Sequence, residues 1–179
     1  MNIFLIGYRC SGKTAVGKWL ANRMHWPFID MDSALVDDCG QSIREVVQTQ
    51  GWRFFREKET ALLKRLCLSG RQVIATGGGV ILNLENVLEM KSCGLLIWLR
   101  ARPETIDHRM RKDVNTSNFR PALTEKGSLE EICEVLAERN PIYSQAMDFF
   151  VDTDDASVEE IGDAILQILA DQNLMSRIA

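Results

Sequence analysis

A glycine-rich segment directly after the first apolar run limits the folds open to this chain. Residues Ile3–Ile6 are all apolar, and they lead into a match to G-x-x-x-x-G-K-T at Gly7–Thr14. Glycines let such a segment curl so that successive backbone N–H groups point at phosphate oxygens, and the helix that follows presents its positive end. Helical spacing follows at once, at Ala15, Val16, Trp19 and Leu20. We therefore expect a phosphate-binding loop between a strand and a helix, with Lys13 reaching the β- and γ-phosphates and Thr14 binding Mg²⁺.

Length and composition indicate a single globular domain. At 179 residues the chain suits one α/β domain, and 46% hydrophobic with 26% charged residues allows a buried core. A formal net charge of −4 without a Lys/Arg block gives no basis for binding nucleic acid. The five cysteines are scattered without metal-binding spacing, and no apolar run is long enough for a membrane span. We expect a cytoplasmic protein without a zinc site or disulfide framework, and a monomer, because no spare apolar stripe remains once the core is assigned.

Five apolar runs have the length of buried strands and alternate with helical patterns. They are Asn2–Ile6, Pro27–Asp30, Gln72–Thr76, Leu95–Leu99 and Phe149–Asp152. Such alternation predicts an α/β fold in which a parallel sheet is covered by helices on both faces. Signals for helix starts are a proline and two possible capping boxes, at Pro103, Ser128 with Glu131, and Ser157 with Glu160.

Two segments interrupt the regular alternation. Residues 112–127 are polar and contain Arg120-Pro121, which is typical of a surface loop, and the length suggests a lid. Residues 33–69 form a helical region longer than a minimal crossover, with Trp52, Phe54 and Phe55 beside several charges. We expect residues 1–179 to form one domain, with 33–69 as a substrate-binding lobe.

The end of the second strand carries two carboxylates. In open parallel sheets ligands bind outside the carboxyl ends of the strands, so Asp30 and Asp32 are candidate site residues. Strand alternation places both side chains on one side if the extended geometry persists, where one would hold Mg²⁺ and the other a substrate hydroxyl. The alternative is that Asp32 caps a helix that starts near Ser33.

Three consecutive glycines and three arginines complete the set of unusual residues. Gly77–Gly79 follow the third strand, and they either expose backbone amides to a ligand or make a tight turn. Arg56, Arg120 and Arg139 have side chains that grip carboxylate or phosphate with two prongs. The alternatives are an ion pair of Arg56 with Glu59, a solvated loop charge at Arg120 and a helix-end charge at Arg139, just before a proline expected to interrupt the helix.

Together these motifs resemble the shikimate kinase family of P-loop small-molecule kinases, which are related in fold to nucleoside monophosphate kinases. The segments that carry the resemblance follow the family's order along nearly the whole chain: Gly7–Thr14, Asp30–Asp32, Phe55-Arg56 with Glu59, Gly77–Gly79, Arg120-Pro121 and Arg139–Tyr143. The resemblance implies a three-layer fold with a five-stranded parallel sheet in the order 2-3-1-4-5, a substrate lobe and a lid. It implies ATP-dependent phosphorylation of the 3-hydroxyl of shikimate, in the biosynthesis of chorismate and aromatic amino acids.

The resemblance also implies roles for individual residues in substrate binding. Asp32 would bond the hydroxyls of shikimate and either accept the 3-hydroxyl proton or orient that hydroxyl. The carboxylate of shikimate would be held by Arg56 and Arg139, together with the backbone amides of Gly78 and Gly79.

On the nucleotide side, the resemblance implies that the whole loop contacts ATP, through Gly7, Tyr8, Arg9, Cys10, Ser11, Gly12, Lys13 and Thr14. Thr14 would bind Mg²⁺ directly and Asp30 would bind it through water. Arg120 would swing in with the lid to the transferring phosphate, so that Asp32, Lys13 and Arg120 form the catalytic set. Arg109 resembles the arginine that stacks near adenine, with Arg111 as a neighbouring alternative.

Two positions depart from the family's pattern. Many family members have glycine where this chain has Cys10, so the loop carries a side chain at a crowded turn. Asp152–Asp155 places acidic residues on the expected adenine side, where basic residues can occur in relatives.

Three other functions are compatible with a phosphate-binding loop. A gluconate or nucleotide kinase would share the fold, but the triple glycine and the paired arginines argue against it. A non-catalytic nucleotide-binding relative would not need the intact set of Lys13, Asp32 and the arginines. A GTPase is disfavoured because the chain has no Asn-Lys-x-Asp segment to bind guanine.

Overall fold

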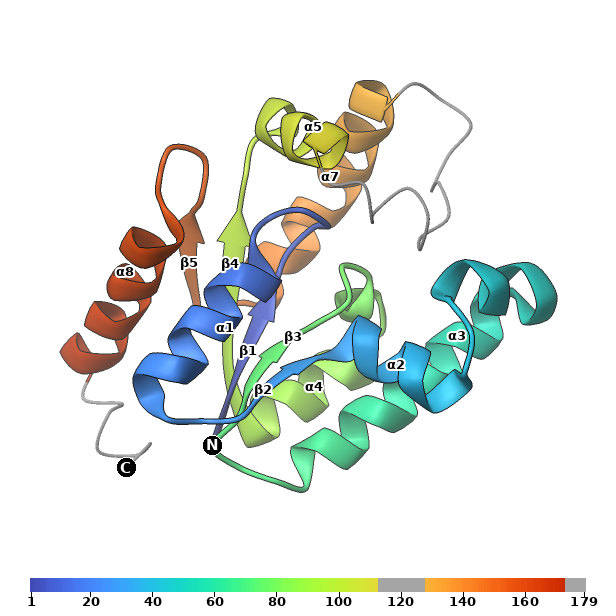
Figure 1. Cartoon of the computed structure of the whole chain (residues 1–179), viewed down its shortest axis with the longest axis horizontal. Helices are drawn as coiled ribbons and strands as arrows, with labels where there is room; N and C mark the ends of the chain where they lie inside the picture. Colours follow the sequence, from blue (N-terminus) through green and yellow to red (C-terminus); the bar gives the residue numbers. More distant parts are fainter. Residues whose placement is uncertain (113–127, 173–179) are drawn as a thin grey trace.

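The computed structural model describes residues 1–112 and 128–172, which form a five-stranded parallel sheet with helices on both faces (Figure 1). The strands are β1 (Asn2–Ile6), β2 (Phe28–Asp30), β3 (Val73–Ala75), β4 (Gly94–Arg100) and β5 (Phe149–Asp152). Their order is β2-β3-β1-β4-β5, and every pairing is parallel. The predicted fold class and strand order are therefore confirmed, and each strand overlaps its predicted apolar run.

The helices fill the connections between strands. They are α1 (Lys13–Met24), α2 (Met31–Cys39), α3 (Ile43–Cys67), α4 (Leu84–Cys93), α5 (Pro103–Lys112), α7 (Ser128–Ala146) and α8 (Val158–Asp171), with a short 3₁₀ turn, η1 (Val80–Leu82). Pro103 opens α5 as predicted, and Ser157 forms the predicted capping box at α8. A further capping box, which was not predicted, joins Ser42 and Glu45 at the start of α3.

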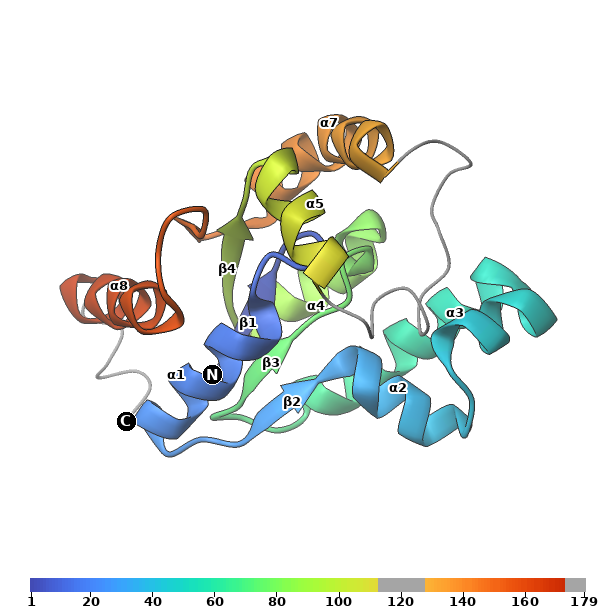
Figure 2. The ribbon, with the colours of Figure 1, turned by 45° about the horizontal axis from the view of Figure 1, so that its top comes forward.

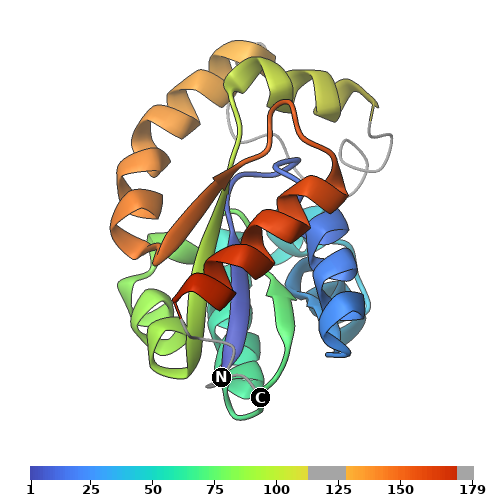
Figure 3. The same ribbon diagram turned by 90° about the vertical axis from the view of Figure 1, so that its left-hand side faces the viewer.

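Side-chain alternation along β1 divides the core into two layers. Ile3 and Leu5 face the cluster formed with α1 and α8, whereas Phe4 and Ile6 face the cluster formed with α2, α3, α4 and α7. All four side chains are fully buried, as expected for a central parallel strand. Figure 3 shows α1 and α8 on the near side of the strands and α7 on the other. Within the described residues, no helix is long and apolar enough to cross a membrane.

A third apolar cluster covers the carboxyl end of the sheet. It packs α5 against α7, and Tyr8 from the loop after β1 is buried within it, together with Ala101, Ile106, Ile132, Val135 and Leu136. Figure 2 shows α5 lying close to this loop. The cluster therefore fixes the position of the loop relative to two helices that flank the strand ends.

Two helices contain a residue that commonly interrupts a helix. Within α3, Gly51 has φ 84° and ψ 166°, which kinks the helix. In contrast, α7 continues through Pro141 to Ala146. The expectation that this proline interrupts the helix is therefore wrong, and so is the helix-end interpretation of Arg139, which lies inside α7. A proline removes one backbone hydrogen bond, but the residues after it on α7, Tyr143 and Ala146, are buried in the core.

Candidate active site

The loop between β1 and α1 forms a compact cradle around a buried lysine. The Lys13 ammonium donates to the carbonyl oxygens of Gly7 at 2.8 Å and Tyr8 at 2.6 Å. Gly7 has a positive φ of 141°, and a Cβ there would lie 2.5 Å from the Leu99 carbonyl oxygen, so glycine is required by both conformation and space. The hydroxyl of Ser11 is buried without a hydrogen-bond partner among the described residues. A cradle with a buried cation and an unsatisfied hydroxyl is suited to phosphate.

Cys10 occupies a strained position in this loop. Its φ is 57°, in the left-handed region that favours glycine, which costs a residue with a Cβ roughly 1–2 kcal/mol. The chain thus departs from the family's pattern at a position where glycine would adopt the backbone conformation at a lower energetic cost. Arg109 Nη1 donates to the Cys10 carbonyl oxygen at 3.4 Å and ties the loop to α5.

Asp30 and Asp32 do not share one extended segment. Asp30 is the N-cap of α2, and its Oδ1 accepts hydrogen bonds from the backbone N of Asp32 at 3.1 Å and of Ser33 at 3.3 Å. Strand alternation therefore does not place the two carboxylates, and the prediction that Asp32 caps the helix is wrong, because α2 starts at Met31, one residue after Asp30. Asp32 sits in the first turn of α2 and lines a pocket.

The donor set beside the loop fits a hard divalent cation. Thr14 Oγ1 donates to Asp30 Oδ2 at 2.7 Å, which brings a hydroxyl and a carboxylate oxygen together at the start of α1. Oxygen ligands of this kind are what Mg²⁺ prefers, usually completed by water and substrate phosphates. Among residues 1–112 and 128–172, no group of three or more His, Cys, Asp or Glu side chains is placed to hold a metal ion. The residues present therefore fit a cation that shares its ligands with a bound nucleotide.

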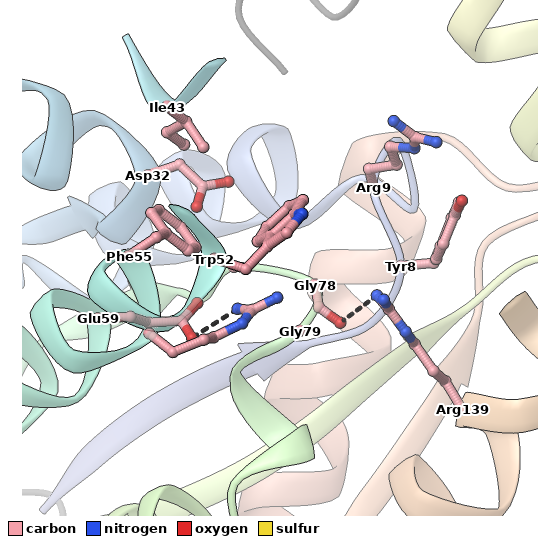
Figure 4. Close-up of a pocket in the computed structure, with 12 residues that line it drawn as sticks. Tyr8, Arg9, Asp32, Ile43, Trp52, Phe55, Glu59, Gly78, Gly79 and Arg139 are labelled. Carbon is pink, nitrogen blue, oxygen red and sulfur yellow. Dashed lines mark hydrogen bonds and ion pairs between the residues drawn. The ribbon is translucent and has the colours of Figure 1, made fainter. Parts of the chain in front are cut away.

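A second pocket opens directly beside the loop (Figure 4). Its walls come from the loop, the start of α2, α3, the triple glycine and α7, through Tyr8, Arg9, Asp32, Ile43, Trp52, Phe55, Arg56, Glu59, Gly77, Gly78, Gly79 and Arg139. All five residues predicted to bind the second substrate line this pocket, although they come from four separate segments. The pocket combines two carboxylates with three guanidinium groups around an aromatic wall.

Glu59 anchors Arg56 at the floor of this pocket. Arg56 Nη1 donates to Glu59 Oε2 at 2.6 Å, so Arg56 forms the ion pair that was the alternative interpretation. It also lines the pocket, so both interpretations of Arg56 hold. The Glu59 side chain is only 1% exposed, and burial raises the pKa of its carboxyl against the opposing effect of Arg56. A Cβ on Gly77 would lie 2.7 Å from Glu59 Oε1 and 3.0 Å from Asp32 Oδ1, and a Cβ on Gly79 would overlap the Arg56 guanidinium. The glycines therefore make room for these charged groups.

The carbonyl of Gly78 joins the two halves of the site. It accepts hydrogen bonds from Tyr143 Oη at 2.5 Å and from Arg139 Nη1 at 3.2 Å, both from α7. A Cβ on Gly78 would lie 3.3 Å from the Gly7 carbonyl oxygen and 3.4 Å from the Arg9 backbone N, so Gly78 packs against the phosphate loop. Sequence reasoning gave Tyr143 no role, although it lies in the motif with Arg139 and has the bulk for a core position.

Arg9 links the loop to the first turn of α7. Its Nη2 lies 2.5 Å from Glu131 Oε1, with side-chain exposures of 11% and 6%, and the guanidinium also lies over the Tyr8 ring. Glu131 gave no functional signal in the sequence beyond a possible cap. This nearly buried pair holds a cation at the border between the loop and the pocket.

The predicted adenine side is built around Arg109. Arg109 Nη1 donates to Thr153 Oγ1 at 3.0 Å and its Nη2 to the Thr153 carbonyl, whereas Arg111 pairs with Asp107 on the exposed face of α5. Geometry therefore favours Arg109 over Arg111 as the residue near the base. Arg120, predicted to act from a lid, lies outside the described residues, as does all of the lid except Lys112.

The acidic segment Asp152–Asp155, at the end of β5 and just after it, pairs with arginines at the end of β4 and just after it. Arg100 binds Asp152 through two nitrogens at 2.5 and 2.8 Å, and Arg102 lies 3.4 Å from Asp154 and 3.2 Å from Asp155. These partners account for acidic residues at positions where relatives can be basic. The negative charges of this segment are thus paired with arginines of the same chain.

Taken together, the strand order, the lysine-centred cradle at the end of β1 and an adjoining pocket for an anionic molecule define a P-loop kinase with a small-molecule acceptor. The family model for shikimate kinase matches residues 9–170. The chain is 42% identical over 174 residues to the shikimate kinase of Syntrophus aciditrophicus. The matched region covers 93% of this chain and 89% of the relative. This chain belongs to the shikimate kinase family.

Solved structures agree with this assignment. The shikimate kinase of Acinetobacter baumannii, solved in complex with shikimate, matches with a TM-score of 0.90 and 28% identity over 97% of this chain and 94% of that one. A gluconokinase from Sinorhizobium meliloti covers 98% of this chain and 96% of its own, with a TM-score of 0.58 and 18% identity. The second likeness shows the shared fold alone, so the family rests on the sequence matches.

Proposed function

We propose that this enzyme transfers the γ-phosphate of ATP to the 3-hydroxyl of shikimate, which yields shikimate 3-phosphate and ADP. The observation that carries the proposal is the direct contact between the two halves of the site, because Tyr8 and Arg9 of the phosphate loop also line the pocket that holds Asp32, Arg56 and Arg139. A donor and an acceptor bound in these places would meet at the loop. Membership of the shikimate kinase family supports the choice of acceptor.

Recognition of shikimate would use charge at one end of the pocket and hydrogen bonding at the other. Arg56 and Arg139 offer guanidinium forks that suit a carboxylate, and Glu59 holds the fork of Arg56 in place. The amides of Gly78 and Gly79 add donors from the backbone. Asp32 on the opposite wall would then receive the hydroxyl groups of the ring.

Phosphoryl transfer depends chiefly on alignment and on cations near the developing charge. Lys13 supplies a buried cation in the cradle, and Arg120 would supply a second when residues 112–127 close over the nucleotide. Asp32 would orient the 3-hydroxyl and take its proton as the new P–O bond forms. Closure of the lid would exclude water, which otherwise would receive the phosphate in place of shikimate.

Mg²⁺ is the cofactor that the donor set fits, with Thr14 as a direct ligand and Asp30 acting through water. Bound with ATP, it would neutralise charge on the phosphate oxygens. The Thr14–Asp30 hydrogen bond at 2.7 Å supports this assignment, because it keeps both oxygens at the mouth of the cradle.

The remaining parts of the proposal concern organisation. We infer a monomer in the cytoplasm, with residues 33–69 as the substrate lobe. The position of α2 and α3 supports the lobe, since both helices contribute to the acceptor pocket.

Asp32→Asn tests the acceptor half of the site. The amide keeps the size of the side chain but cannot take a proton, so shikimate-dependent ADP formation should be lost while ATP still binds. Asp37→Asn, at an exposed position on the same helix, is the matched control and should retain activity. Assays should include quinate, gluconate and nucleoside monophosphates beside shikimate. Substantial turnover by Asp32→Asn would exclude the proposed role of Asp32 in orienting and deprotonating the acceptor hydroxyl. If the wild-type enzyme forms no more ADP with shikimate than without it, the proposed reaction is excluded.

A further inference from the structure

Two cysteines lie together at the ends of neighbouring helices, away from the nucleotide loop. Cys67 is the last residue of α3 and Cys93 is the last residue of α4. Both are partly buried and pack against the larger core cluster. Their sulfur atoms lie near successive carbonyls of α4, with Cys67 Sγ 3.9 Å from Glu89 O and Cys93 Sγ 3.7 Å from Met90 O. The two thiols are also within hydrogen-bond reach of each other, so the sulfur atoms are neighbours.

The two thiols also interact with each other, and this makes them unequal. A hydrogen bond from Cys67 lowers the pKa of the Cys93 thiol, against the opposing effect of burial. The same hydrogen bond, with burial, raises the pKa of the Cys67 thiol. Because the thiolate is the nucleophilic form, the directions of these two pKa shifts favour Cys93 as the sulfur that reacts first and Cys67 as the one that resolves the product.

We propose that Cys67 and Cys93 form a redox-modification site, which a peroxide converts to a reversible disulfide. The Cys93 thiolate attacks one oxygen of hydrogen peroxide, the O–O bond breaks, and the products are a sulfenic acid on Cys93 and hydroxide, which takes up a proton to form water. The Cys67 sulfur then attacks the Cys93 sulfur, and the S–O bond breaks. The departing hydroxide takes the proton of Cys67 and leaves as a second water, so two thiols lose two electrons and one peroxide gains them.

The disulfide would close a segment that matters for the acceptor pocket. Residues 68–92 contain β3, the triple glycine and η1, and Cys67 lies two helical turns beyond Glu59 on α3. A covalent link there restricts the unfolded chain and ties the pocket-bearing helix to α4. We expect the oxidised enzyme to melt at a higher temperature than the reduced one and to return to its original melting temperature with dithiothreitol.

The test is oxidation of the whole reduced protein with hydrogen peroxide, followed by mass spectrometry without reductant. The expected product has lost two hydrogen atoms, contains the linked Cys67 and Cys93 peptides, and reverts with dithiothreitol. Cys67→Ser should stop at a sulfenic acid on Cys93 that dimedone traps. Cys93→Ser should slow modification of Cys67 about tenfold or more, because the nucleophilic sulfur is gone.

Cys133→Ser is the matched control, since Cys133 is exposed on α7, and it should leave the rate and the product unchanged. The proposal is overturned if peroxide adds oxygen to Cys133 while Cys67 and Cys93 remain thiols. It is also overturned if the linked peptides pair either cysteine with another residue. The wild-type peptide map decides the matter even if a serine variant fails to fold.

Discussion

At the scale of single residues, the hydroxyl of Tyr143 has a larger effect on the site than its buried position suggests. It donates to the Gly78 carbonyl oxygen at 2.5 Å, and its ring stacks on Trp98 with centroids 5.5 Å apart. Gly78 touches the phosphate loop on its other side. The hydroxyl therefore positions the turn whose amides face the acceptor pocket, although it does not line that pocket itself.

Tyr143→Phe should weaken the binding of shikimate without unfolding the enzyme. Phenylalanine keeps the ring against Trp98 and removes a single hydrogen bond, which is worth about 1 kcal/mol, or roughly fivefold in an equilibrium. The KM for shikimate should rise by about that factor, and the KM for ATP should change less. Steady-state kinetics with each substrate varied in turn measures the split. Equal changes in both KM values would mean that Tyr143 supports the fold alone.

The residues of the site differ in how far the sequence could predict them. The phosphate loop was predictable because its glycines and its lysine are neighbours in the chain. Asp30 and Asp32 were identified, but their geometry was not, because either one can cap a helix and the choice depends on packing. Tyr143 was missed because its partner lies 65 positions away, and no local pattern records such a contact.

At the scale of elements, the kink in α3 precedes the aromatic residues that line the acceptor pocket and sets the direction of the helix that carries them. Gly51 has φ 84° and ψ 166°, a combination that only glycine adopts readily, and Trp52, Phe55 and Arg56 follow it directly. The sequence did not predict this kink, since a single glycine within a helical pattern is tolerated. The capping box at Ser42 was available from its spacing to Glu45, and it marks the start of the element.

Gly51→Ala should destabilise the enzyme by about 1–3 kcal/mol and raise the KM for shikimate. The cause is the backbone alone, because a Cβ at this position would meet nothing within 4 Å. Urea denaturation and shikimate kinetics measure the two effects. Gly40→Ala is the matched control: its Cβ also meets nothing, but φ 63° and ψ 15° are accessible to other residues at a smaller cost. A Gly51 variant no less stable than the Gly40 variant would contradict this account of the kink.

At the scale of the whole molecule, the sheet brings both halves of the reaction to one edge. Alternating apolar runs predicted a parallel sheet because buried strands of this type are nearly continuous in hydrophobicity. The strand order came from the family resemblance instead, since no local pattern states which strands pair. Once β1 is central, the loop after it and the glycines after β3 must adjoin, as the contact between Gly78 and Gly7 shows.

The same arrangement places a carboxyl in the interior, and this affects the stability of the whole fold. Glu59 is buried, and desolvation raises the pKa of its carboxyl above its ordinary value of 4.5 despite the attraction of Arg56. As the pH rises past 4.5, the unfolded chain releases this proton first, whereas the folded chain retains it. The contribution of Glu59 to stability is thus greatest below 4.5 and falls as the pH rises through its folded pKa.

Comparison of the wild type with Glu59→Gln isolates this contribution, because glutamine has nearly the same shape and no proton to release. The difference in unfolding free energy between the two proteins, from urea denaturation at a series of pH values, should move in favour of the glutamine variant as the pH rises above 4.5. It should become constant once the folded carboxyl has ionised. If the difference instead moves in favour of the wild type as the pH rises toward 4.5 from below, the 2.6 Å pairing with Arg56 outweighs burial. In that case the acceptor pocket would be held together by its charges, rather than formed at a cost in stability that substrate binding offsets.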